Sequence, residues 1–177
     1  MSILRYLGLA PTGPRPGSPE TETETVRKIT DALDRLDPER ARYIAGFAYV
    51  LSRVARADLK ISDQETRAME RLVAGHGGLP EEQAIIVVQI AKTQNKLFGG
   101  TENFLVTREF AKIASFDQKL ALLDCLFAVA ASENLITTEE DNEIRQIADE
   151  LGIEHRDFIA VRSKHRDQLS FLNRPSS

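Results

Sequence analysis

Residues 50–73 (VLSRVARADLKISDQETRAMERLV) and residues 125–148 (CLFAVAASENLITTEEDNEIRQIA) decide the fold, because the second stretch repeats the first without a gap. Apolar residues match apolar residues, and acidic residues match acidic residues, at the same offsets. The matched pairs include Leu51 and Leu126, Val54 and Val129, Asp58 and Glu133, Ile61 and Ile136, and Glu65 and Glu140. We infer an internal duplication of a helix–loop–helix unit, whose two copies pack together because neither alone can bury its apolar face.

The pattern on both sides of the repeats is helical. Apolar residues recur at the three- and four-residue spacing of an amphipathic helix, and Pro38 and Pro80 stand at helix starts beside acidic residues. The β-branched run at 85–88 suits a strand, but the length of its segment favours a helix. No alternating strand pattern occurs, so we predict an all-α fold. The expected helices lie near 26–36, 38–57, 62–75, 80–98, 102–114, 117–131, 138–151 and 155–170.

The two ends differ from this helical region. Residues 1–25 hold four of the seven prolines and an alternating Glu-Thr run, which indicates a flexible N-terminal tether and linker. Within it, the apolar cluster from Ile3 to Leu9 suits docking on the core of the same chain, on a neighbouring subunit or on a partner. Residues 26–172 form the predicted helical domain, and residues 173–177 are expected to fray.

Composition bounds the class of protein. The 177 residues carry a formal net charge of −4, and 42% are hydrophobic, which is an ordinary balance for a globular chain. A single cysteine, Cys125, excludes an internal disulfide and a multi-cysteine zinc site. No apolar run is long enough for a transmembrane helix. We therefore expect a soluble cytoplasmic protein that does not bind nucleic acid.

The loop between the helices of each copy carries the acidic residues. Ser62 with Glu65, and Thr137 with Glu140, have the spacing of capping boxes, in which a hydroxyl and a glutamate satisfy backbone N–H groups at a helix start. Capping alone explains these four residues. It does not explain Asp58 and Glu133, because each is expected at a helix C-terminus, where a negative charge is disfavoured.

A divalent cation would explain the remaining acids. Asp58 and Glu133 each precede a second carboxylate by seven residues, and Ca²⁺ or Mg²⁺ bound by oxygen ligands would offset the repulsion between like charges. The order of residues resembles the second half of an EF-hand. Apolar and basic residues stand where that loop needs oxygen ligands, so these are not EF-hands.

The same loops resemble a known family. The pattern Ala-Asp-x-x-Ile-Ser-x-x-Glu at 57–65, its copy at 132–140 and the following Leu-Gly-Ile at 151–153 are similar to the tellurite-resistance TerB family and to the TerB-like region of membrane-anchored DnaJ-type co-chaperones. The resemblance spans about residues 40–165. It implies seven to nine helices in two pseudo-symmetric halves, a bacterial stress response, membrane-proximal protein partners, and divalent metal binding by Asp58, Glu65, Glu133 and Glu140.

Other candidate motifs are less convincing. His155-Arg156-Asp157 and His165-Arg166-Asp167 mimic a kinase catalytic loop, but both lack its asparagine, and we expect them on the polar face of the last helix. The three histidines lack the spacing of a zinc site, and Cys125 is expected in the core. We therefore predict that the chain is not an enzyme.

The sequence leaves two functions open. In the first, the four acids meet where the two halves join and share one Ca²⁺ or Mg²⁺ ion. In the second, the chain is a metal-free scaffold or co-chaperone-like adaptor that recruits a protein partner through helix surfaces or the Ile3–Leu9 cluster. The oligomeric state does not follow from the sequence.

Overall fold

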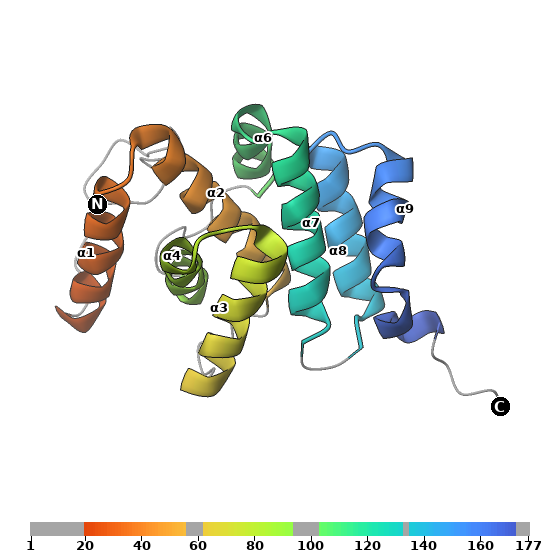
Figure 1. The fold of residues 1–177 in the computed structure, drawn as a ribbon, viewed down its shortest axis with the longest axis horizontal. Helices are drawn as coiled ribbons and strands as arrows, with labels where there is room; N and C mark the ends of the chain where they lie inside the picture. Colours follow the sequence, from red (N-terminus) through yellow and green to blue (C-terminus); the bar gives the residue numbers. More distant parts are fainter. Residues whose placement is uncertain (1–19, 56–61, 94–102, 133–134, 173–177) are drawn as a thin grey trace.

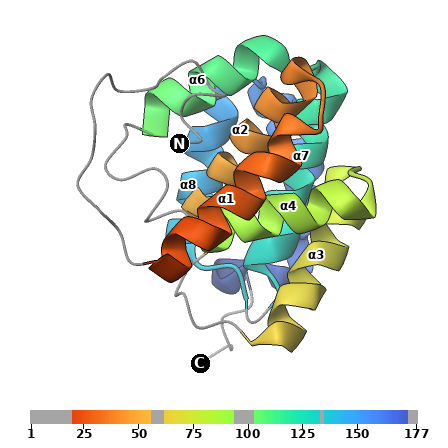
Figure 2. The same cartoon turned by 90° about the vertical axis from the view of Figure 1, so that its left-hand side faces the viewer.

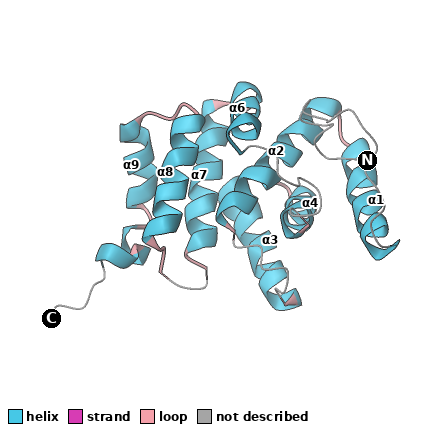
Figure 3. Cartoon of the chain, turned by 180° about the vertical axis from the view of Figure 1, so that it is seen from behind, coloured by secondary structure: helices cyan, strands magenta, loops and turns pink. Residues whose placement is uncertain are grey.

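The computed structural model describes residues 20–55, 62–93, 103–132 and 135–172 (Figure 1). These residues form eight α-helices and two short 3₁₀ turns. The helices are α1 (Glu20–Asp34), α2 (Pro38–Val54), α3 (Asp63–Gly77), α4 (Glu81–Lys92), α6 (Asn103–Ile113), α7 (Phe116–Ala130), α8 (Thr138–Glu150) and α9 (His155–Ser163), followed by η2 (Arg166–Gln168) and η3 (Ser170–Leu172). The predicted all-α fold is confirmed. Within the described ranges there is no β-strand, only one isolated bridge between Ile136 and Leu169 (Figure 3).

Helix α2 lies at the centre of the bundle. It packs against α4, α6, α7 and α8, and twelve of its seventeen residues are buried. Gly46 lets α6 approach, because a Cβ there would lie 2.6 Å from Cδ2 of Phe110. In Figure 2, α6 crosses one end of the molecule, and α1 lies across α4. Helix α2 therefore joins the N-terminal helices to the C-terminal three.

The duplicated unit is visible in the helix order. Helices α2, α3 and α4 correspond to α7, α8 and α9, and α7, α8 and α9 lie side by side in Figure 1. Each second helix is followed by a glycine with positive φ, Gly78 at +67° and Gly152 at +74°. Such a glycine ends a helix with little strain. The next residues, Leu79 and Ile153, are both buried, so the two copies end alike.

Three predicted boundaries differ from the structure. Helix α1 begins at Glu20, inside the predicted linker, where glutamates suit the positive end of the helix dipole. Helix α4 ends at Lys92, and Thr93 is its C-cap, with a backbone that leaves the helical conformation at φ −104° and ψ 11°. Helix α9 ends at Ser163, and the following chain turns to pair with Ile136. The predicted tether at 1–19 and the predicted frayed end at 173–177 lie outside the described residues.

Candidate functional site

The first acidic loop leads into the capping box of α3. Ser62 Oγ accepts a hydrogen bond from the N–H of Glu65 at 3.2 Å, and Glu65 Oε2 accepts one from the N–H of Ser62 at 2.6 Å. These hydrogen bonds lower the pKa of Glu65, and the bond from the backbone N–H of Ser62 has the largest effect. Glu65 is exposed and negatively charged, and the cap fixes its position.

The second acidic loop repeats this arrangement. Thr137 Oγ1 accepts from the N–H of Glu140 at 3.1 Å, and Glu140 Oε2 accepts from the N–H of Thr137 at 2.8 Å. Ile136, just before the cap, is fully buried, as expected of a hydrophobic staple. Both predicted capping boxes are therefore confirmed. In each, the glutamate uses Oε2, so Oε1 is the oxygen that a ligand would contact.

Glu65 and Glu140 belong to the first turns of α3 and α8. The N-termini of α3 and α8 both lie at the lower edge in Figure 1, and Figure 3 shows the same edge from behind. Asp58 and Glu133 lie outside the described residues. Within the described part of the chain, no three His, Cys, Asp or Glu side chains form a group that could hold a metal ion. The structure thus describes two of the four predicted ligands, Glu65 and Glu140, each in the capping box of its own helix.

A second polar cluster lies between the two halves. Asp124, in the middle of α7, bonds through Oδ2 to His76 Nδ1 and through Oδ1 to His165 Nε2, each at 2.7 Å. Since a carboxylate only accepts, both ring nitrogens donate their N–H. His76 lies in the last turn of α3, and His165 follows α9. One carboxylate therefore joins three separate segments.

The surroundings keep Asp124 ionised. Partial burial raises the pKa of Asp124, but the hydrogen bonds and charges of His76 and His165 outweigh it, and the pKa falls below its usual value. Next to it, burial raises the pKa of the Cys125 thiol to about 12, so Cys125 is a neutral core residue. The cluster therefore consists of the ionised carboxylate of Asp124 with an imidazole N–H donor at each of its two oxygens.

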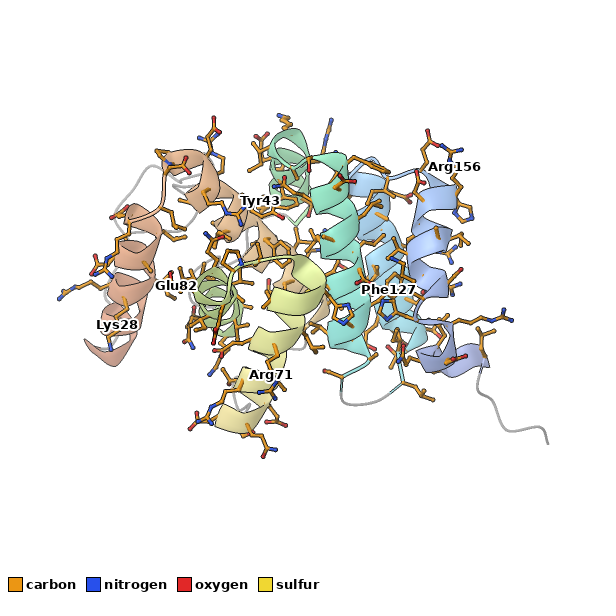
Figure 4. All side chains as sticks on the ribbon, in the orientation of Figure 1. Lys28, Tyr43, Arg71, Glu82, Phe127 and Arg156 are labelled. Atoms are coloured by element: carbon orange, nitrogen blue, oxygen red, sulfur yellow. The ribbon has the colours of Figure 1, made fainter. Side chains whose placement is uncertain are left out.

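The sequence prediction for His165 was wrong. His165 is only 7% exposed and stacks on Phe127, with ring centroids 5.5 Å apart, instead of lying on the polar face of a last helix. Phe127 lies on α7 inside the molecule, whereas Arg156 points outward from α9 (Figure 4). The one signal in the sequence was Asp124 itself, a charged residue within an otherwise apolar run. Its partners, far away along the chain, could not be identified.

A third polar cluster surrounds Arg53 of α2. Its guanidinium contacts Glu143 at 2.7 Å, Glu150 at 2.5 Å and the Thr107 hydroxyl at 2.8 Å, and the Arg53 side chain is 3% exposed. Glu143 and Glu150 belong to α8. Like the Asp124 cluster, this one joins the first helix of one copy to the second helix of the other. A buried guanidinium with these partners fixes how the helices dock.

In each copy, a side chain of the third helix also bonds to a side chain of the second helix. In the second copy, Arg162 binds both oxygens of the buried Asp141, at 2.7 and 3.0 Å. In the first, Lys92 Nζ donates to Thr66 Oγ1 at 3.2 Å. Thr66 and Asp141 occupy matching positions of the repeat. Asp141 is therefore a structural residue, although it directly follows the predicted ligand Glu140.

The comparisons agree with this architecture. The family model described as tellurite resistance protein TerB matches residues 44–163, which is more than half of the chain. No curated protein and no solved structure gives a significant match. The matched region begins in α2 and ends in α9, so it covers both copies of the repeat and all residues of the polar clusters described above except His165. The chain belongs to the TerB family.

Proposed function

We propose that this TerB-family chain is a non-enzymatic, stress-associated binding protein that binds a divalent cation, Ca²⁺ or Mg²⁺, at its two acidic loops. The ligands are Asp58, Glu65, Glu133 and Glu140. The observation that carries the proposal is the pair of capping boxes: they hold one carboxylate at the start of α3 and one at the start of α8, each with an oxygen outside the cap, and both helices begin at the lower edge in Figure 1. Hard cations prefer such oxygen ligands.

The loops also differ from a catalytic site. Among the described residues, the polar clusters contain carboxylates, imidazoles and cations, and the described thiol, Cys125, is buried. The sequence contains no nucleophile motif or cofactor motif beside the acidic loops, and this favours a binding role. Within the described ranges no helix is long and apolar enough to cross a bilayer. We propose that the chain works in the cytoplasm and reaches membrane-proximal stress complexes through a protein partner.

The test is thermal melting during titration with CaCl₂ or MgCl₂. A cation at 100 times its Kd stabilises the folded state by about 2.7 kcal/mol, which raises the Tm of a chain of this size by roughly 5–10 °C. The Asp58→Asn/Glu133→Gln variant should lose this shift. The matched control, Glu81→Gln/Asp117→Asn, removes two carboxylates from the first turns of α4 and α7 and should keep it.

A metal-free scaffold is the second candidate. Phe116, at the start of α7, is 53% exposed, and Ile113, at the end of α6, is 37% exposed. Apolar side chains on both sides of one turn suit contact with a protein partner. A wild-type Tm that stays constant up to millimolar cation, or an equal shift in the Asp58→Asn/Glu133→Gln variant, would refute the cation site and favour this scaffold.

A further inference from the structure

The segment after α9 pairs with the second acidic loop. The N–H of Ile136 donates to the carbonyl of Gln168 at 2.7 Å, and the N–H of Ser170 donates to the carbonyl of Ile136 at 2.9 Å. Leu169, between them, is 1% exposed and belongs to the same apolar core as Ile136. We call residues 164–172 the C-terminal latch. Because Ile136 directly precedes the capping box of Thr137 and Glu140, the latch pairs with the described part of the second acidic loop, residues 135–140.

The latch is anchored to α7 by His165. Its Nε2 bonds to Asp124 Oδ1 at 2.7 Å, and its ring stacks on Phe127 at an interplanar angle of 20°. The N–H of Gln168 donates to the carbonyl of His165 at 3.0 Å. His165, which bonds to Asp124, and Gln168, which bonds to Ile136, therefore belong to the same turn of the chain. Moving the imidazole therefore moves the residues that pair with Ile136.

The same carboxylate extends the anchor to α3. His76 bonds to the other carboxylate oxygen of Asp124, and the ring centroids of His76 and His165 lie 6.1 Å apart. The charged groups that act on Asp124 are these two imidazoles, from α3 and from the latch. Helices α2, α8 and α9, which also pack on α7, add none among the described residues. Asp124 thus holds the latch and the end of α3 together.

We propose that the C-terminal latch is a regulatory element, which Asp124 holds closed against α7 and which braces the second acidic loop through Ile136. Opening the latch frees the backbone at Ile136, next to the capping box that holds Glu140. The part of this proposal that concerns cation affinity rests on the proposed function, because a loop that is braced for only a fraction of the time binds more weakly by that fraction. The closed and open states themselves do not depend on a cation.

Amide hydrogen exchange in the full chain, without added cation, tests the latch. The Asp124→Asn variant should speed exchange at the amides of Ile136 and Ser170 by at least about tenfold, since a hydrogen bond to a charged group is lost. Amides within α8 should keep their wild-type rates. His155→Asn is the matched control, because His155 is an exposed histidine of α9 outside the latch, and it should change neither amide.

A second variant covers the case in which Asp124→Asn fails to fold. His165→Phe keeps an aromatic ring to stack on Phe127 and removes the bond to Asp124, so it should open the latch while α7 stays packed. Wild-type exchange at Ile136 and Ser170 in a folded Asp124→Asn or His165→Phe variant would overturn the proposal. So would faster exchange that extends equally over all of α8, because this would show general destabilisation.

A CaCl₂ titration separates the latch from the proposed function. If the wild type binds Ca²⁺, the His165→Phe variant should bind it more weakly and the His155→Asn variant equally well. Equal affinity in the His165→Phe variant would overturn the regulatory role. If the wild type binds no Ca²⁺, the proposed cation site fails, whereas the exchange rates still decide whether the latch exists.

Discussion

Asp124 is a single carboxylate with two partners, and this makes it sensitive to acid. Its pKa lies below the usual value because His76 and His165 favour the ionised form more than partial burial disfavours it. A carboxyl group with a lowered pKa in the folded state stabilises the protein above its ordinary pKa of 3.8 and loses this contribution as the pH falls through the folded value. Asp124 therefore contributes stability at neutral pH and loses it in acid.

This predicts a difference in acid unfolding. From about pH 4.5 down to about pH 2.5, wild-type protein should lose more stability than the Asp124→Asn variant, since the variant has no carboxyl group to protonate there. Urea midpoints measured at several pH values provide the comparison. Asp117→Asn, on the first turn of the same helix, should follow the wild-type profile. Parallel profiles for wild type and Asp124→Asn would contradict this assignment.

At the scale of one helix, α3 contains two glycines with opposite roles. Gly75 is exposed, and a Cβ there would meet nothing within 4 Å. Gly77 is buried, and a Cβ there would lie 2.8 Å from Cζ of Phe47, a ring that is itself fully buried. The first glycine only weakens the helix, whereas the second allows α3 to approach α2.

Alanine substitutions should therefore have opposite effects. Gly75→Ala should stabilise the protein by about 0.5–1 kcal/mol, because alanine loses less backbone entropy in a helix. Gly77→Ala should destabilise it by roughly 1–3 kcal/mol, because the Phe47 ring must move within a packed core. Urea denaturation measures both. If Gly77→Ala leaves the free energy of unfolding unchanged or raises it, the close approach of α2 and α3 does not limit packing.

The elements also show which signals in the sequence were sufficient. The capping boxes at Ser62 and Thr137 could be predicted because their hydrogen bonds join residues three apart. The end of α9 could not, because the chain after it turns to pair with the distant Ile136. Hydrogen bonds between residues that are close in the chain can be predicted from sequence patterns, whereas contacts between distant segments cannot.

For the whole molecule, the repeated stretch was sufficient to predict the all-α fold and the TerB family, because the duplicated pattern covers both halves. The sequence did not reveal how the halves are joined. The Asp124 and Arg53 clusters bring together residues that lie far apart in the chain, and no motif spacing records such contacts. Both clusters tie the first helix of one copy to the second helix of the other, so they fix the relative position of α3 and α8.

The most direct test of the shared cation site is an amide NMR titration of the wild-type chain with CaCl₂. One ion bound by Asp58, Glu65, Glu133 and Glu140 should shift the amide signals of residues 57–65 and 132–140 together, with one apparent Kd. The signals of α4 and α6 should stay in place. Shifts confined to one loop, or the absence of shifts in both loops at millimolar Ca²⁺, would contradict a single ion held between the two copies.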